Sequence, residues 1–100
     1  MLFSIHALDK PGIADKRKAV HGDHIAHLKA AGNFGVTITV GGPLVSDDGA
    51  GPAGSLIVVE APDRATADKF AHADPFYKNG IWAKVDVTRF DRRTRMSTDW

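Results

Sequence analysis

The chain has 100 residues, of which 43% are hydrophobic and 25% charged, and this composition at a common domain length predicts one globular domain. Its formal net charge of +1 gives no field suited to nucleic acid or an acidic membrane, and its lack of cysteine excludes disulfides and thiolate chemistry. No apolar run approaches the roughly 20 residues that cross a bilayer. The opening MLFSIHAL lacks the length and cleavage site of a signal peptide, so we expect a cytoplasmic protein.

The first two predicted elements are a strand and a helix. Alternate apolar side chains share one face of residues 2–8, which predicts a short strand, and DKPG then turns the chain. Residues 13–31 are rich in alanine and lysine and free of proline, which favours a helix. Gly22 costs about 1 kcal/mol relative to alanine inside a helix. The helix could therefore break there, with Asp23 as the N-cap of a second piece.

A hairpin is predicted in the middle of the chain. Residues 35–40, GVTITV, alternate as a strand that places Ile38 and Val40 on the same side. The following GGPL, residues 41–44, either ends this strand or lets a ligand approach the backbone, and we favour the first interpretation. After the turn-rich SDDGAGPAG, residues 55–60 form the next strand, SLIVVE, which is apolar on both faces.

The last third of the chain predicts a helix, a strand and a tail. Residues 62–73 favour a helix with a buried stripe made of Ala67, Phe70 and Ala71. Residues 81–90 alternate again as a strand. The polar tail, residues 91–100, carries arginines with acidic residues among or near them, so we expect it to be solvated and not to bind nucleic acid.

The order β-α-β-β-α-β predicts an α+β fold, a ferredoxin-like two-layer sandwich, over residues 1–90. Such a sandwich covers one face of its sheet with two helices and leaves the other face bare. Because residues 55–60 are apolar on both sides, they need cover on the bare face as well. We therefore predict a homodimer whose sheets face each other. His6 could face either a pocket or this dimer seam.

Three of the five histidines lie within residues 21–28. With about 100° per residue, His24 falls in the middle of the apolar stripe of the first helix, and Arg17 joins it if Gly22 does not break the helix. A buried imidazole must find hydrogen-bond partners or carry a penalty of about 1–3 kcal/mol. Two interpretations stay open: a core histidine that binds a backbone carbonyl, and a functional side chain in a pocket.

His21 and His27 flank His24 at about 60° on either side. We expect both to be solvated at the helix edge, with His27 able to pair with Asp23 four residues earlier. Helical metal ligands usually stand four residues apart, or pair Glu with His three apart. Three histidines spaced three residues apart along a helix point in directions that differ too much for all of them to bind one ion. We therefore predict no metal site and no cofactor.

Several motifs appear in a specific order along residues 1–90. They are the strand with DKPG, Arg17, His24-Ile25, Gly41-Gly42-Pro43-Leu44, Asp47-Asp48-Gly49, the run from Gly54 to Ala61, and Ala73-Asp74-Pro75-Phe76. In this order and spacing the chain resembles the YciI-like (YCII-related domain) family. The resemblance implies a sandwich of the dimeric α+β barrel type.

The resemblance also implies a histidine–aspartate pair in a cleft, which maps onto His24 and Asp74. Asp74 precedes Pro75, which pushes it out of the helical conformation and into a turn. An Asx-turn in the loop is therefore the alternative role of this aspartate. As the partner of His24, its carboxylate would fix the tautomer of the ring and leave the other nitrogen as a base.

The function expected from these residues is proton transfer, since no serine or cysteine lies in a nucleophile motif. The family resemblance points to dehydrochlorinase-like lyase activity. We therefore expect a small enzyme without cofactor that carries out elimination or isomerisation on a small polar organic molecule.

The further pocket residues that we expect are Arg17, Gly42, Pro43, Ser55 and His6. Ser55 is either a hydrogen-bond donor or an ordinary packed residue. The alternative is a non-catalytic module that binds a small ligand or assists another enzyme.

Overall fold

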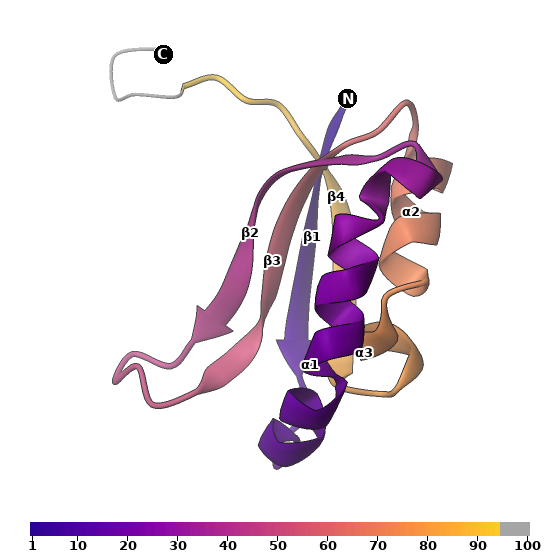
Figure 1. The fold of residues 1–100 in the computed structure, drawn as a ribbon. Coiled ribbons are helices and arrows are strands. Elements are labelled where there is room, and N and C mark those ends of the chain that lie inside the picture. Colours follow the sequence, from indigo (N-terminus) through magenta and orange to yellow (C-terminus); the bar gives the residue numbers. More distant parts are fainter. Residues whose placement is uncertain (95–100) are drawn as a thin grey trace.

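Four antiparallel strands form one sheet in the computed structural model, which describes residues 1–94 (Figure 1). The elements are β1 (Leu2–Asp9), α1 (Ala14–Lys29), the 3-10 helix η1 (Ala31–Phe34), β2 (Thr37–Val45), β3 (Pro52–Glu60), α2 (Arg64–His72), α3 (Pro75–Lys78) and β4 (Trp82–Phe90). The strand order is β2-β3-β1-β4, and the helices lie on one side of the sheet. This arrangement confirms the predicted ferredoxin-like α+β fold.

Helix α1 is continuous through Gly22, so of the two alternatives left open for this segment the unbroken helix is the correct one. A Cβ atom at Gly22 would have nothing within 4 Å, and the glycine faces solvent within the helix. Its propensity cost of about 1 kcal/mol is small beside the packing of a 16-residue helix against the sheet. Because the helix is unbroken, Arg17 and His24 both keep their places on its buried side.

The GGPL segment continues strand β2, which corrects our interpretation that it ends the strand. Gly41 to Leu44 pair in register with Ile57 to Gly54 of β3. Pro43 lacks an N–H group, and it is tolerated because β2 is an edge strand. The pairing shifts register between Ile38 and Val40, and this irregularity ends the alternation expected there: Ile38 packs against the core, whereas Val40 is 59% exposed.

Two buried clusters join the helices to the sheet. The larger one includes the predicted α2 stripe, and it packs against Phe3 and Ile5 of β1 and Ile57 and Val59 of β3. The smaller one consists of Ala7, Phe76, Ile81 and Trp82. This smaller cluster lies beneath α1, because Ile13 and Val20 pack against it, and it therefore supports the side chains that α1 directs inward.

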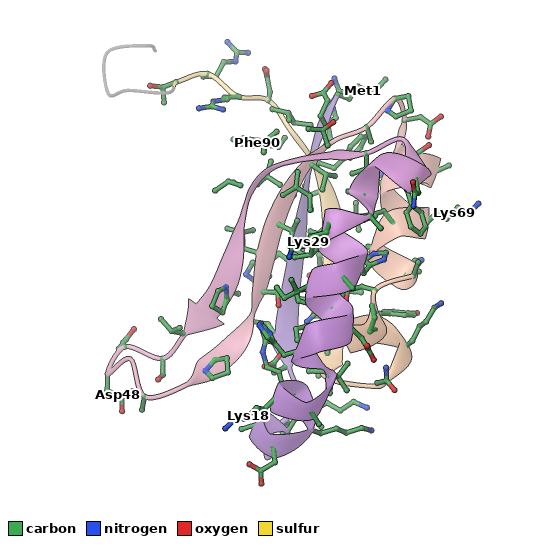
Figure 2. All side chains as sticks on the ribbon, viewed as in Figure 1. Met1, Lys18, Lys29, Asp48, Lys69 and Phe90 are labelled. Carbon is green, nitrogen blue, oxygen red and sulfur yellow. The ribbon has the colours of Figure 1, made fainter. Side chains whose placement is uncertain are left out.

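The polar side chains lie mostly at the outer surface. Lys18 and Lys69 extend from the helices, and Asp48 marks the tip of the β2–β3 hairpin (Figure 2). The face of the sheet opposite the helices carries apolar side chains too, since Leu8 and Phe90 are 44% and 43% exposed. No helix within residues 1–94 has the length and apolar character needed to span a membrane.

Candidate active site

A buried histidine and a buried aspartate lie in direct contact between α1 and the start of α3. Nδ1 of His24 is 2.8 Å and 2.9 Å from the two carboxylate oxygens of Asp74. His24 is 6% exposed and Asp74 1%. Because an ionised carboxylate only accepts hydrogen bonds, Nδ1 carries the ring proton when the ring is neutral. The lone pair of that ring is then on Nε2.

Asp74 also caps the short helix α3. Its backbone is extended (φ −63°, ψ 131°), as expected for a residue before proline, and Pro75 occupies the first turn of the helix. Oδ1 of Asp74 accepts a 2.8 Å hydrogen bond from the backbone N–H of Phe76. The carboxylate therefore makes the local Asx contact and the contact to His24 at the same time, and the cap holds it in place for the ring.

Two aromatic residues that were not among the predicted site residues enclose the imidazole of His24. Phe76 stacks on it with ring centroids 4.0 Å apart and planes 10° apart. Trp82 meets it edge-on, with centroids 6.5 Å apart. Phe76 directly follows Asp74 and Pro75 in the sequence. This position beside the predicted aspartate was the signal that could have identified Phe76 as part of the site. The rings restrict the imidazole to one orientation.

Arg17 lies two turns before His24 on the same side of α1, and it is also buried. Its Nη1 donates to both carboxylate oxygens of Asp9, at 2.8 Å and 2.9 Å, and its Nη2 donates to Oγ of Ser55 at 3.1 Å. The guanidinium carbon also lies 4.5 Å from the centre of the Phe76 ring. Burial raises the pKa of the Asp9 carboxyl, and the charge and hydrogen bonds of Arg17 offset part of this rise. Asp9 is the first residue of the DKPG motif, and no pattern in the sequence indicated its contact with Arg17.

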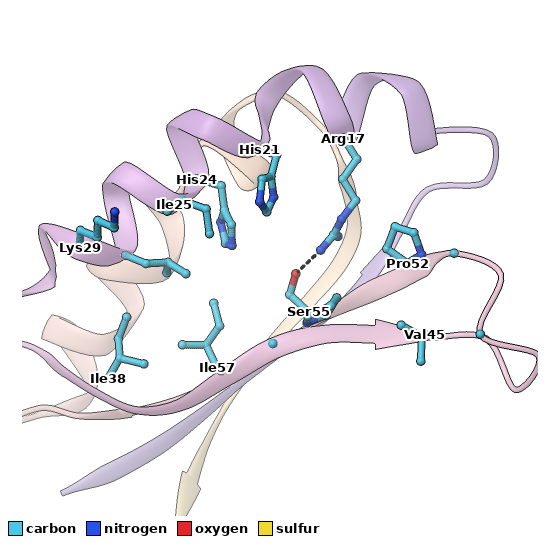
Figure 3. A pocket seen from close by; sticks show the side chains of 16 residues that line it. Arg17, His21, His24, Ile25, Lys29, Ile38, Val45, Pro52, Ser55 and Ile57 are labelled. Carbon is cyan, nitrogen blue, oxygen red and sulfur yellow. Dashed lines mark hydrogen bonds between the residues drawn. The ribbon is translucent and has the colours of Figure 1, made fainter.

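A cavity of about 640 Å³ separates α1 from the β2–β3 hairpin (Figure 3). Its helix side includes His21, His24 and Ile25, and its strand side includes Gly42, Pro43 and Ser55. Among the described residues that line it there are lysine and arginine but no aspartate or glutamate. The cavity thus offers an apolar surface, two cationic side chains and three imidazole or hydroxyl groups. Such a site suits a small polar or anionic molecule.

The model of the YCII-related domain family matches residues 1–91. The chain belongs to this family. Protein YciI of Escherichia coli is 32% identical over 92% of this chain and 98% of its own length. An uncharacterized protein of Haemophilus influenzae is 31% identical over the same shares of the two chains.

Among solved structures, this YCII-related chain is similar to the 5-chloro-2-hydroxyhydroquinone dehydrochlorinase TftG of Burkholderia phenoliruptrix, in complex with 2,5-dihydroxybenzoquinone. The two are 32% identical, with a TM-score of 0.79, and the similarity covers 91% of this chain and 94% of TftG. This neighbour supports the assignment of the fold to the dimeric α+β barrel type.

Four of the five additional pocket residues predicted for this YCII-related chain line the cavity: Arg17, Gly42, Pro43 and Ser55. His6 does not, which corrects that prediction. It alternates along β1 with the buried Ile5 and Ala7, so it points to the opposite face of the sheet, where it is exposed.

The two histidines beside His24 differ from each other. His21 is exposed and lines the rim of the cavity. His27 is half-buried: its ring stacks on Phe70 with centroids 4.4 Å apart, and its Nε2 donates to the carbonyl oxygen of Phe70 at 2.9 Å. The expected solvation of His27 was therefore wrong, and its Nε2 binds Phe70 and not Asp23, because α2 packs against this side of the helix. Within residues 1–94 no three histidine or acidic side chains are grouped so that they could hold a metal ion.

The predicted tail, residues 91–100, is only partly described. Arg93 and Asp91 form an exposed ion pair at 2.8 Å. The remainder of that prediction, including Arg95 and Asp99, falls on residues 95–100, which lie outside the described residues.

Proposed function

We propose that this protein is a small enzyme, independent of cofactors, that catalyses elimination or isomerisation of a small polar organic molecule by proton transfer. His24 is the general acid–base, and Asp74 orients its ring. The observation that carries the proposal is the buried contact between His24 Nδ1 and Asp74 at 2.8 Å, which directs the basic Nε2 away from the carboxylate in a residue that lines the cavity. A positioned base of this kind contributes about 10²–10⁴-fold to a rate.

The proton is the only group that His24 handles in this mechanism. Nε2 takes a proton from the substrate, and the electron pair of the broken C–H or O–H bond moves into the substrate. In an elimination this pair expels a leaving group such as chloride, and in an isomerisation the imidazolium returns the proton to another atom. The dehydrochlorinase activity named for TftG supports the elimination, since that enzyme is 32% identical over most of both chains.

A panel of chlorinated hydroquinones, lactones and enols, followed by ultraviolet absorbance, tests the proposal. We expect turnover of at least one member, a loss of about 10²–10⁴-fold in His24→Ala, and a smaller loss in Asp74→Asn, which keeps the cap of α3. Wild-type rates in His24→Ala would contradict the proposal. Binding of 2,5-dihydroxybenzoquinone without turnover of any member would favour a non-catalytic binding module instead.

The orientation of the ring is testable without a substrate. Nitrogen-15 NMR of the neutral His24 ring should show the proton on Nδ1, and Asp74→Asn should populate both tautomers, because an amide can either donate to or accept from that nitrogen. His27 is the internal control, since its bond to the Phe70 carbonyl keeps its proton on Nε2 in both proteins. A mixture of tautomers at His24 in the unmodified protein would contradict the orienting role of Asp74.

We also infer that the enzyme is a homodimer joined through the open face of its sheet. That face carries the exposed side chains of Leu8 and Phe90, and the described helices all lie on the other side. A second copy offers the same apolar surface, so two sheets placed face to face bury both. The similarity to a structure of the dimeric α+β barrel type supports this arrangement.

A further inference from the structure

The cavity changes from polar to apolar along its length. On α1, His24 lines it, and Leu28 follows one helical turn farther along. On β3, Ser55 lines it first, and Ile57 lies two positions later on the same face of the sheet. Ile57 belongs to the larger buried cluster and Leu28 packs against that cluster, so the two walls become apolar at the same end of the cavity.

We call this end of the cavity the apolar lobe. It is lined by Ile25, Leu28, Ile38, Gly41 and Ile57. Figure 3 shows Ile38 and Ile57 on the strand side, displaced along the cavity from the contact of Arg17 with Ser55. The other cationic residue of the described lining, Lys29, is exposed. The lobe therefore offers a bound molecule apolar contacts and no buried charge.

Gly41 leaves open space in the strand wall of the lobe. It pairs with Ile57, and directly opposed residues of an antiparallel pair face the same side, so Gly41 faces α1. A Cβ atom at Gly41 would lie 3.8 Å from Cγ2 of both Ile38 and Ile57, which is ordinary van der Waals contact. The φ angle of Gly41 is not positive, so the backbone does not require glycine there. Glycine inside a strand often marks a place where a ligand approaches closely.

A single polar ring beside His24 would not fill the lobe. Leu28 lies about 6 Å beyond His24 along the helix axis, because an α-helix rises about 1.5 Å per residue. The whole cavity, at about 640 Å³, lies within the range of about 300–1,000 Å³ that encloses drug-sized ligands. A molecule that occupies both ends therefore needs an apolar substituent on the polar group that meets His24. Burying this substituent removes apolar surface of both the molecule and the lobe from water.

We propose that the apolar lobe binds a short alkyl or aryl substituent of the substrate, and that Gly41 sets how large this substituent can be. The substrate class is then an amphiphilic molecule, a hydroxylated quinone or enol that carries such a substituent. This inference rests on the proposed function, because proton transfer at His24 determines which end of the cavity holds the polar group.

Binding of two quinones tests the lobe without requiring turnover. The probes are 2,5-dihydroxybenzoquinone and its 3-butyl derivative, which share one polar ring, and calorimetric titration measures their affinities. We expect the unmodified protein to bind the butyl compound at least about tenfold more tightly, since each buried methylene contributes about fourfold to an affinity. Gly41→Val should remove most of this preference, because its methyl groups would occupy the lobe beside Ile38 and Ile57.

The matched control is Val40→Ile, which adds bulk to the neighbouring residue of β2. The side chain of Val40 is 59% exposed and is not part of the described cavity lining, so this variant should keep the preference. Circular dichroism shows whether each variant has folded, and Gly41→Ala, with an intermediate preference expected, replaces Gly41→Val if the larger side chain prevents folding. Equal binding of the two quinones by the unmodified protein, binding of neither, or the same preference in the Gly41 and Val40 variants would overturn the assignment.

His24→Ala separates this inference from the proposed function. The variant should lose turnover and still prefer the butyl compound, because His24 is not part of the lobe. Full activity of His24→Ala would refute the proposed function, and the ratio of the two affinities would still report on the lobe. Where the quinones are turned over, Gly41→Val should lower kcat/KM more for the butyl compound than for the unsubstituted one.

Discussion

At the scale of single residues, the ion pair of Asp9 and Arg17 connects the end of β1 to α1. The side chain of Asp9 is 5% exposed and that of Arg17 is 8% exposed. Each charge therefore needs the other to replace the interactions with water that it lost on folding. Removing one partner of such a pair leaves an uncompensated buried charge. The pair therefore supports both the fold and the position of Arg17 beside Ser55.

We predict that Asp9→Asn lowers the free energy of unfolding by about 3 kcal/mol, because it leaves the charge of Arg17 buried without its counterion. Urea denaturation measures this change. The matched control is Asp91→Asn, which removes the same charge from the exposed pair with Arg93 and should change stability little. Similar effects of the two substitutions would show that the buried pair has no special role.

At the scale of elements, two glycines that the sequence does not distinguish lie in opposite structural environments, one crowded and one open. Gly54 lies in β3 where an added Cβ would clash with the carbonyl oxygen of Ala7 in β1, whereas Gly22 lies in α1 with open space around it. We predict that Gly54→Ala destabilises the protein by disturbing the β1–β3 pairing. Gly22→Ala should stabilise it by about 0.5–1 kcal/mol. Thermal and urea unfolding measure both, and a stabilising Gly54→Ala would contradict the close approach of the two strands.

Helix α2 contains a cap that should make stability depend on pH. Asp63 accepts a 2.8 Å bond from the backbone N–H of Thr66, and hydrogen bonding to Thr66 lowers the pKa of the Asp63 carboxyl. A carboxyl group whose pKa is lower in the folded protein stabilises the fold fully when the pH is above its pKa in the unfolded chain, about 3.9. This stabilisation is lost as the pH falls through the pKa of the folded state.

Asp63→Asn keeps a capping oxygen and removes the titration. We predict that the unmodified protein is more stable than this variant at pH 6, and that the difference shrinks toward pH 3. Urea denaturation at both pH values measures the difference in stability between the two proteins. Both proteins contain the other carboxyl groups, so the effect of their titration cancels in this difference. A difference that stays constant with pH would exclude this contribution of Asp63.

At the scale of the whole molecule, the open sheet face should hold two copies together. Leu8 on that face and Tyr77 on α3 are both 44% exposed, which makes them a matched pair. We predict that Leu8→Lys converts a dimer into a monomer in sedimentation experiments, because it places a charge in the interface between the sheets. Tyr77→Lys should leave the dimer intact, and a dimer that survives Leu8→Lys would place the interface elsewhere.

Much of the candidate site could be predicted because helix geometry is local. The period of about 3.6 residues placed His24 and Arg17 on the buried side of α1, and both are 6% exposed in the structure. The order of strands and helices predicted the sandwich in the same way, since alternation and periodicity depend on near neighbours in the sequence. The contact of His24 with Asp74 came only with the family resemblance, because the two residues are 50 positions apart.

The sequence by itself determined the periodicity of each element, and so the fold class and the inward direction of His24. Only the tertiary structure decided the partners: Asp9 for Arg17, Phe70 for His27, and Phe76 for the ring of His24. It also decided that Gly41 to Leu44 pair with β3, and that His6 faces away from the cavity. The physical reason is that periodicity reports which side of an element is apolar, whereas a hydrogen bond or a strand pairing depends on which distant segment packs against that side.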